Sequence, residues 1–217
     1  MSQDIIGLLA DSLLETLYMV GVSALVAVLA GIPLGIVLVT TGRGHIMEHG
    51  KFNAVLGGIV NATRSTPFII LMVAIIPLTR EIAGTSIGTN AAIVPLSIAA
   101  IPFLARIVEA AIREVDHGVI EAAQAMGASP LQIIRKVLIP EALPALVLGV
   151  TITVVSLIGY SAMAGAVGGG GLGDLAIRYG YQRFRPDVML STVVTLIATV
   201  QVVQSCGDRL ARGLNKR

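Results

Sequence analysis

Five long apolar stretches limit what this chain can fold into, because each is long enough to cross a lipid bilayer as a helix. Runs of about 20 uncharged residues span the hydrocarbon core. Such runs extend from Thr16 to Gly42, Phe52 to Thr79 (with one interruption), Ile82 to Ala105, onward from Glu141, and Val188 to Gly207. They predict an all-α integral membrane protein in which residues 1–217 form one transmembrane domain. Its five helices are expected over 13–41, 54–79, 88–114, 140–166 and 187–208.

Composition excludes the soluble and nucleic-acid-binding classes. Charged residues make up 13% of the 217 residues and hydrophobic residues 55%, whereas soluble domains carry about a quarter charged residues. A net charge of +2 is too small to indicate a nucleic-acid partner. The surroundings of this chain are therefore expected to be the lipid bilayer.

The positive residues predict the orientation of the five helices. An odd number of spans places the two termini on opposite sides, and cytoplasmic loops carry an excess of Lys and Arg. With the N-terminus outside, ten of the fifteen Lys and Arg residues fall in cytoplasmic segments, four fall outside, and Arg64 lies within a helix. We predict that the N-terminus is outside and the C-terminus inside.

A short helical hairpin is predicted over 117–139, between the third and fourth helices and on the cytoplasmic side. Its first helix, from Glu121 to Met126, consists mostly of residues that favour helix, and Gly127 suits the left-handed conformation that ends one. Ser129 is then placed to cap a second helix, with Gln132 three residues later to complete a capping box. So many signals that start or end a helix within one loop indicate a rigid element that another protein binds.

A histidine motif in the first cytoplasmic loop raises the alternative of a membrane zinc peptidase. His45, Glu48 and His49 match the H-x-x-E-H pattern of inverted zincins. Zinc hydrolysis also needs a stable helix and a third protein ligand. Here the motif lies in a loop among glycines, and the one other histidine is His117. A solvated loop explains the motif better than a metal site, so no metal ligand is assigned.

Polar residues within two helices are candidates for a solute pathway. A charge inside the membrane costs about 2.5–3.5 kcal/mol on insertion scales, so Arg64 either reaches the lipid headgroups, bonds internally, or lines a pathway. Helix four carries small hydroxyl residues that either bond the preceding turn or face a pathway. Our hypothesis is that the pathway follows helix four, with Met163 as an outer gate. The helix-four candidates are Ser156, Tyr160, Ser161 and Met163.

Two glycine patterns have structural explanations. Gly31 and Gly35 are four residues apart, so another helix backbone is able to approach closely, either within the chain or from a second copy. Gly168, Gly170 and Gly173 match G-x-G-x-x-G, but dinucleotide binding requires a preceding strand, and here a membrane helix precedes the motif. The glycine run is expected to form an irregular segment near the outer surface.

The hairpin also resembles a known family motif. Glu121-Ala-Ala, three residues, Gly127, nine residues, then Val137-x-Ile139-Pro140 fits the EAA loop of bacterial ABC importer permeases, with Val and Ile in place of the pattern's Ile and Leu. Further short matches resemble the methionine branch of that family. They are Arg64-Ser-Thr-Pro-Phe-Ile-Ile-Leu, Ile76-Pro-Leu-Thr-Arg80, Gly84-Thr-Ser-Ile-Gly88 and Gly159-Tyr-Ser-Ala-Met163.

The resemblance implies a type I ABC importer permease of the bacterial inner membrane, which carries methionine (D or L) by alternating access and is not itself an enzyme. Implied partners are a second copy of the chain, two ATPase subunits that bind ATP and Mg²⁺ in its place, and a periplasmic methionine-binding lipoprotein. A permease for another amino acid or small solute remains the alternative. The residues implied to couple the chain to the ATPase are Glu121, Ala122, Ala123, Ala125, Met126, Gly127 and Arg135.

Overall fold

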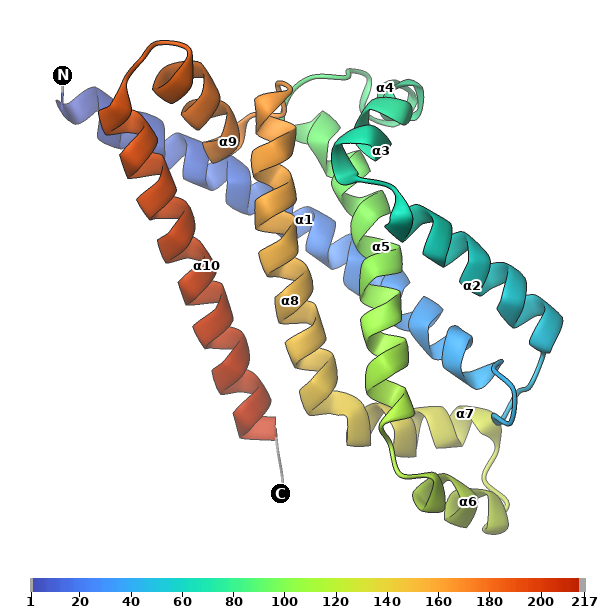
Figure 1. Cartoon of the computed structure of the whole chain (residues 1–217). Coiled ribbons are helices and arrows are strands. Elements are labelled where there is room, and N and C mark those ends of the chain that lie inside the picture. Colours follow the sequence, from blue (N-terminus) through green and yellow to red (C-terminus); the bar gives the residue numbers. More distant parts are fainter. Residues whose placement is uncertain (1, 215–217) are drawn as a thin grey trace.

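The protein is a bundle of long helices with short helices at both ends (Figure 1). The computed structural model describes the backbone of residues 2–214 and the side chains of residues 5–214. The α-helices are α1 (Ser2–Thr40), α2 (Gly50–Ser65), α3 (Phe68–Ala74), α4 (Ile76–Ala83), α5 (Thr89–Arg113), α6 (His117–Ala125), α7 (Pro130–Ile133), α8 (Ile139–Ala166), α9 (Gly171–Leu175) and α10 (Pro186–Leu214). Two π-helical turns, η1 (Ile134–Leu138) and η2 (Ala176–Tyr181), lie between them.

Helix α5 is the centre of the bundle, with α1 crossing it at a steep tilt and α8 beside it (Figure 1). Its Leu96 and Leu104 are fully buried in the main hydrophobic core. A Cβ atom on Gly31 would lie 2.9 Å from the carbonyl oxygen of Ile101, and one on Gly35 would lie 2.6 Å from that of Ala105. The glycine pair of α1 therefore packs against α5 of the same chain.

The second span is not the single helix expected over 54–79. Helices α2 and α3 meet at a bend of 103°. The cause is Pro67, which lacks a backbone N–H and disfavours helical conformation at the preceding residue; Thr66 is extended, with φ −83° and ψ 124°. A second break at Ile75 separates α3 from α4, so the outer part of the expected helix consists of two short helices.

Four helices among residues 2–214 are long and apolar enough to cross a membrane, and the bent pair α2–α3 makes five if it counts as one span. Helix α1 begins at Ser2, eleven residues before the start expected at 13, and α10 continues to Leu214. The described ends of the chain lie at opposite ends of the bundle, and α6 and α7 lie across the end at which α10 finishes (Figure 1).

The glycine run after α8 reverses the chain at the other end of the bundle. Gly168, Gly170 and Gly171 have φ values of +91°, +79° and +73°, which glycine adopts without a Cβ clash. The turn is bonded to α1, because the Gly171 N–H donates to the Glu15 carboxylate at 2.6 Å and the Leu172 N–H to the Thr16 hydroxyl at 2.9 Å. These bonds satisfy N–H groups at the start of α9 and give the run a packing role.

Candidate functional sites: the coupling hairpin and a cavity beside Arg64

The cytoplasmic hairpin is built as its local signals predicted. The Asp116 carboxylate caps α6 by accepting from the Gly118 N–H at 2.7 Å. At the other end of α6, Gly127 has φ +76°, and the Ala128 N–H donates to the Ala123 carbonyl at 3.1 Å. This Gly-terminated turn is the usual way for a helix to end with its last carbonyls satisfied.

The second arm of the hairpin begins with a complete capping box. The Ser129 hydroxyl accepts from the Gln132 N–H, and the Gln132 side chain accepts from the Ser129 N–H at 2.8 Å. From Pro130 the helix continues through η1 into the membrane helix α8 without a break, over Pro130–Ala166. The second arm of the hairpin and the helix that carries the pathway candidates are thus one continuous helical element.

The hairpin presents a mixed apolar and charged surface away from the bundle. Met126 is 81% exposed, which is unusual for a large apolar side chain on a monomer surface. Glu121, Ala122, Ala125, Gly127 and Arg135 are also exposed. Ala123 is different: it is 4% exposed and packs into the main core. Six of the seven coupling candidates are therefore available to a partner, and Ala123 anchors α6 to the bundle.

The first cytoplasmic loop lies against this hairpin. The rings of His45 and His117 are 6.3 Å apart, and His117 in turn lies 3.7 Å from the carboxylate of Glu121. Partial burial lowers the pKa of His45, and the positive charge of Arg113 and the neighbouring His117 lower this pKa further. Neutral His45 is favoured, so the loop packs on α6 without adding a charge.

The histidine motif does not assemble a metal site. Glu48 accepts from the Gly44 N–H at 3.0 Å, and His49 packs edge-on against Phe52 with 6.2 Å between the ring centroids. Among the described side chains, no group of three or more His, Cys, Asp or Glu residues is placed to hold a metal ion. Within the described part of the chain, the His45–His49 motif is not joined by the third ligand that a zinc site needs.

The pathway candidates of α8 divide between two faces. Ser156, Tyr160 and Met163 are spaced at i, i+4 and i+7 and so share one face. On it, Met163 is 48% exposed and Tyr160 is half-buried. Ser161 is 2% exposed, and its hydroxyl donates to the Ile158 carbonyl at 2.8 Å. Ser161 therefore packs inside the chain and does not line the same surface.

A cavity of about 150 Å³ brings Arg64 and Tyr160 together. The Tyr160 ring stacks on Phe68 with 4.8 Å between centroids and 11° between the ring planes. The guanidinium carbon of Arg64 lies 6.0 Å from the centroid of the Phe103 ring. The remaining lining comes from Thr63, Thr66, Leu71 and Ala99. Sequence reasoning missed Phe68 and Phe103, because the packing of α2 and α3 against α5 brings them beside Arg64.

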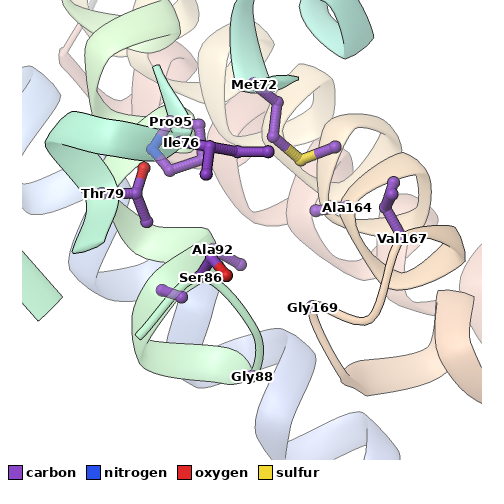
Figure 2. A pocket seen from close by; sticks show the side chains of 11 residues that line it. Met72, Ile76, Thr79, Ser86, Gly88, Ala92, Pro95, Ala164, Val167 and Gly169 are labelled. Carbon is purple, nitrogen blue, oxygen red and sulfur yellow. The ribbon is translucent and has the colours of Figure 1, made fainter. Parts of the chain in front are cut away.

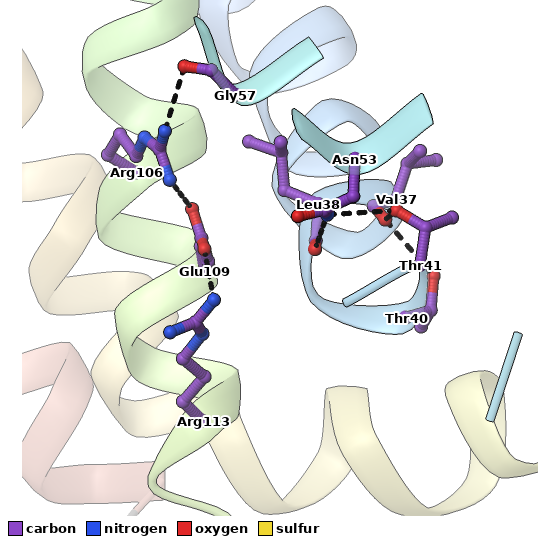
Figure 3. Close-up of polar contacts among 9 residues, drawn as sticks. All are labelled: Val37, Leu38, Thr40, Thr41, Asn53, Gly57, Arg106, Glu109 and Arg113. Carbon is purple, nitrogen blue, oxygen red and sulfur yellow. Dashed lines mark hydrogen bonds and ion pairs between the residues drawn. The ribbon is translucent and has the colours of Figure 1, made fainter. Parts of the chain in front are cut away.

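A second, more open cavity of about 410 Å³ continues from Arg64 along α5. On that helix Glu109 is 6% exposed and accepts from both Arg106 and, at 2.7 Å, Arg113 (Figure 3). Arg106 also donates to the Gly57 carbonyl of α2 at 3.0 Å. These ion pairs form a salt-bridged end of α5 beside Arg64.

A third cavity lies near the other end of the bundle, between α3, α4, α5 and the glycine turn (Figure 2). Its volume is about 30 Å³, which is room for about one water molecule. The Thr79 hydroxyl at its edge has no hydrogen-bond partner among the residues that the structure describes. This cavity is much smaller than the two cavities beside Arg64.

Comparison with known proteins gives a family and close relatives. The family model described as "Binding-protein-dependent transport system inner membrane component" matches residues 31–217. A protein of Vibrio cholerae named "Probable D-methionine transport system permease protein MetI" is 57% identical over 210 residues, which cover 97% of this chain and 93% of that protein.

Solved structures match along the whole chain. "Inward facing conformations of the MetNI methionine ABC transporter" contains a chain with a TM-score of 0.98 and 49% identity, and the match covers 100% of both chains. "Crystal structure of an amino acid ABC transporter with histidines" contains a chain with a TM-score of 0.79 that covers 97% of this chain and 96% of the other. At 19% identity, that second likeness concerns the fold alone.

Proposed function

Because the chain belongs to the family of binding-protein-dependent transport system inner membrane components, we propose that it is the permease subunit of an ATP-driven methionine importer. The observation that carries this proposal is the 57% identity, over 97% of the chain, to a D-methionine permease. The likeness to a chain of the MetNI methionine transporter supports the same substrate. The chain itself is not an enzyme, since its role is to form the route through the bacterial inner membrane.

Energy for import comes from a partner. The sequence contains no G-x-x-x-x-G-K-[ST] loop, so the usual phosphate cradle for ATP is missing from this chain. Two ATPase subunits, with ATP and Mg²⁺, bind the exposed coupling residues of two copies of the chain, and a periplasmic methionine-binding lipoprotein delivers substrate from the other side. Met126 supports this role for the hairpin, because a partner would cover its exposed apolar side chain.

The continuous helix from the hairpin into α8 explains how the ATPase acts on the route. When ATP draws the ATPase subunits together, the two hairpins move with them as levers, and α8 moves as a rigid body. Such movement changes the face that carries Ser156, Tyr160 and Met163. The pathway therefore opens alternately to the two sides, with Arg64 on the inner part and Met163 at the outer gate.

Reconstitution tests this function. The chain is purified together with its ATPase and incorporated into liposomes, and the uptake of radiolabelled methionine is measured with ATP and binding protein. We expect ATP-dependent uptake that an excess of unlabelled methionine suppresses and that histidine or glutamine does not. Uptake suppressed by another amino acid and not by methionine would support the alternative of a permease for a different small solute.

A further inference from the structure

The cavity of about 150 Å³ between α2, α3, α5 and α8 has the features of a small-molecule site. A closed cavity of about 150 Å³ holds a molecule of the size of benzene, and this cavity is partly open, so a longer molecule extends beyond it. Its walls combine aromatic and aliphatic side chains with the hydroxyls of Thr63 and Thr66, and its one charged side chain is Arg64. Apolar walls with a few placed polar groups are typical of ligand sites.

Arg64 has no acidic partner among the side chains that the structure describes. None of the ion pairs formed by described residues includes Arg64, whereas Arg106 and Arg113 both form ion pairs with Glu109. Arg64 lies fourteen residues after the start of α2, or about 21 Å along the helix, and its side chain is exposed on the single chain. A cation within a membrane span needs an anion or water, because the hydrocarbon core provides neither.

The end of α2 provides the opposite charge beside this arginine. In a continuous helix the carbonyls of Arg64 and Ser65 would accept from Phe68 and Ile69, but the bend at Pro67 removes those donors. Neither carbonyl accepts a hydrogen bond from another described residue. Free carbonyls at a helix C-terminus carry partial negative charge, and interrupted membrane helices use such groups to bind polar solutes.

Resting on the proposed methionine import, we propose that this cavity is a transient binding site for the amino acid within the membrane. The Arg64 guanidinium binds the α-carboxylate, and the free carbonyls at the end of α2 accept from the α-ammonium. The thioether lies against the aromatic rings, with which sulfur makes favourable contacts. Those rings belong to Phe68, Phe103 and Tyr160.

The larger neighbouring cavity gives the route of release from this site. Arg64 lines both cavities, and the second is lined further by Arg106, Glu109 and Arg113 on one face of α5. Arg106 and Arg113 are both bonded to Glu109, whose one negative charge offsets one of their two positive charges. A solute carboxylate therefore binds them less strongly than it binds Arg64, which forms no ion pair with a described side chain. The amino acid is therefore held at Arg64 and released as it moves along α5.

A protection experiment on the purified permease–ATPase complex tests the site directly. Cys206 is replaced with serine, and Thr66→Cys places one thiol in the cavity wall, where Thr66 is half-buried. The rate of maleimide labelling is then measured with increasing methionine, with norleucine, and with methioninol, which lacks the carboxylate. We expect methionine to slow labelling, norleucine to do so less, and methioninol to have no effect.

Arg64→Gln supplies the decisive comparison, because it removes the charge and keeps a shorter side chain with N–H donors. A lost charge-assisted hydrogen bond corresponds to about a tenfold loss of affinity, so about tenfold more methionine is expected for the same protection. Thr85→Cys, exposed in the outer loop, is the matched control and is expected to label at one rate throughout.

Three results would overturn the proposed site. One is a Thr66→Cys complex that still imports methionine but is not protected by it, which would leave the methionine function intact. Another is protection that Arg64→Gln does not change. The third is protection by phosphatidylglycerol and not by methionine, which would show that Arg64 faces lipid headgroups. A complex that imports no methionine at all, with Thr66 in place, contradicts the proposed function instead.

Discussion

Neighbouring residues of α8 differ in exposure, and therefore in whether they are able to contact a solute or a second copy. Ser161 and Met163 are two positions apart, yet Ser161 is 2% exposed and Met163 is 48% exposed. Their hydropathies suggest the reverse, since a serine tolerates water better than a methionine. Because the helix turns 100° per residue, only Met163 shares a face with Ser156 and Tyr160. An exposed, flexible methionine on that face suits a contact with a second copy.

We predict that Met163→Ala loosens the proposed outer gate. Removing most of a partly buried methionine side chain is expected to shift the equilibrium between closed and open gate by about 1 kcal/mol, or about fivefold. ATP hydrolysis without binding protein should rise by a similar factor, as measured in liposomes. Leu190→Ala on α10, where Leu190 is 66% exposed, is the control. Unchanged hydrolysis and uptake in Met163→Ala would exclude the gate role.

At the scale of elements, the hairpin is stiff because both of its turns are bonded internally. The Gly127 turn closes α6, and the Ser129 capping box opens α7. Ala123 fixes α6 to the core from the inside, while Met126 and Glu121 face outward. A lever must combine these properties, namely an anchored inner side and an exposed outer side.

We predict that Gly127→Ala weakens coupling without filling any occupied space. No atom lies within 4 Å of a Cβ at this position, so the cost comes from the left-handed backbone alone, about 1–2 kcal/mol. The amount of ATPase retained on the purified permease should fall by up to about thirtyfold, and methionine uptake should fall with it. Gly127→Asn is the matched variant, because asparagine tolerates that conformation better. Equal behaviour of Gly127→Ala and the unmodified chain would count against the lever.

For the whole molecule, the broken second span and the central α5 together create the interior polar surface. Arg106 joins α5 to α2 through the Gly57 carbonyl, and Asn53 joins α2 to the end of α1 by donating to the Leu38 carbonyl at 2.6 Å (Figure 3). These contacts hold α2 in place although its continuation turns away at Pro67. The cavities beside Arg64 are the result.

The charge distribution predicts the orientation of the whole bundle, and labelling from outside the cell membrane tests it. In a Cys206→Ser background, Gln182→Cys should react with an impermeant maleimide in intact spheroplasts, and Lys51→Cys only after permeabilisation. Both positions are exposed, so access depends on the side of the membrane. With ten positive residues against four, we expect one orientation throughout. Labelling of Lys51→Cys in intact spheroplasts would reverse the topology.

The sequence by itself determined the features that depend on neighbouring residues. Apolar length identified the membrane helices, and the EAA spacing identified the importer family that the family match confirms. The capping box and the left-handed Gly127 followed from local backbone chemistry, which side chains two to four residues apart decide.

Only the tertiary structure decided which distant residues meet. From the sequence, Gly31 and Gly35 could pack against a helix of the same chain or of a second copy. In the structure they pack against α5 of the same chain. Pro67 interrupts the helix locally, but the contact between Arg64 and Phe103 depends on packing between residues about 40 positions apart, as does the direction of the 103° bend. Local helix propensity does not predict such contacts, because they stabilise the protein only after the helices have packed against one another.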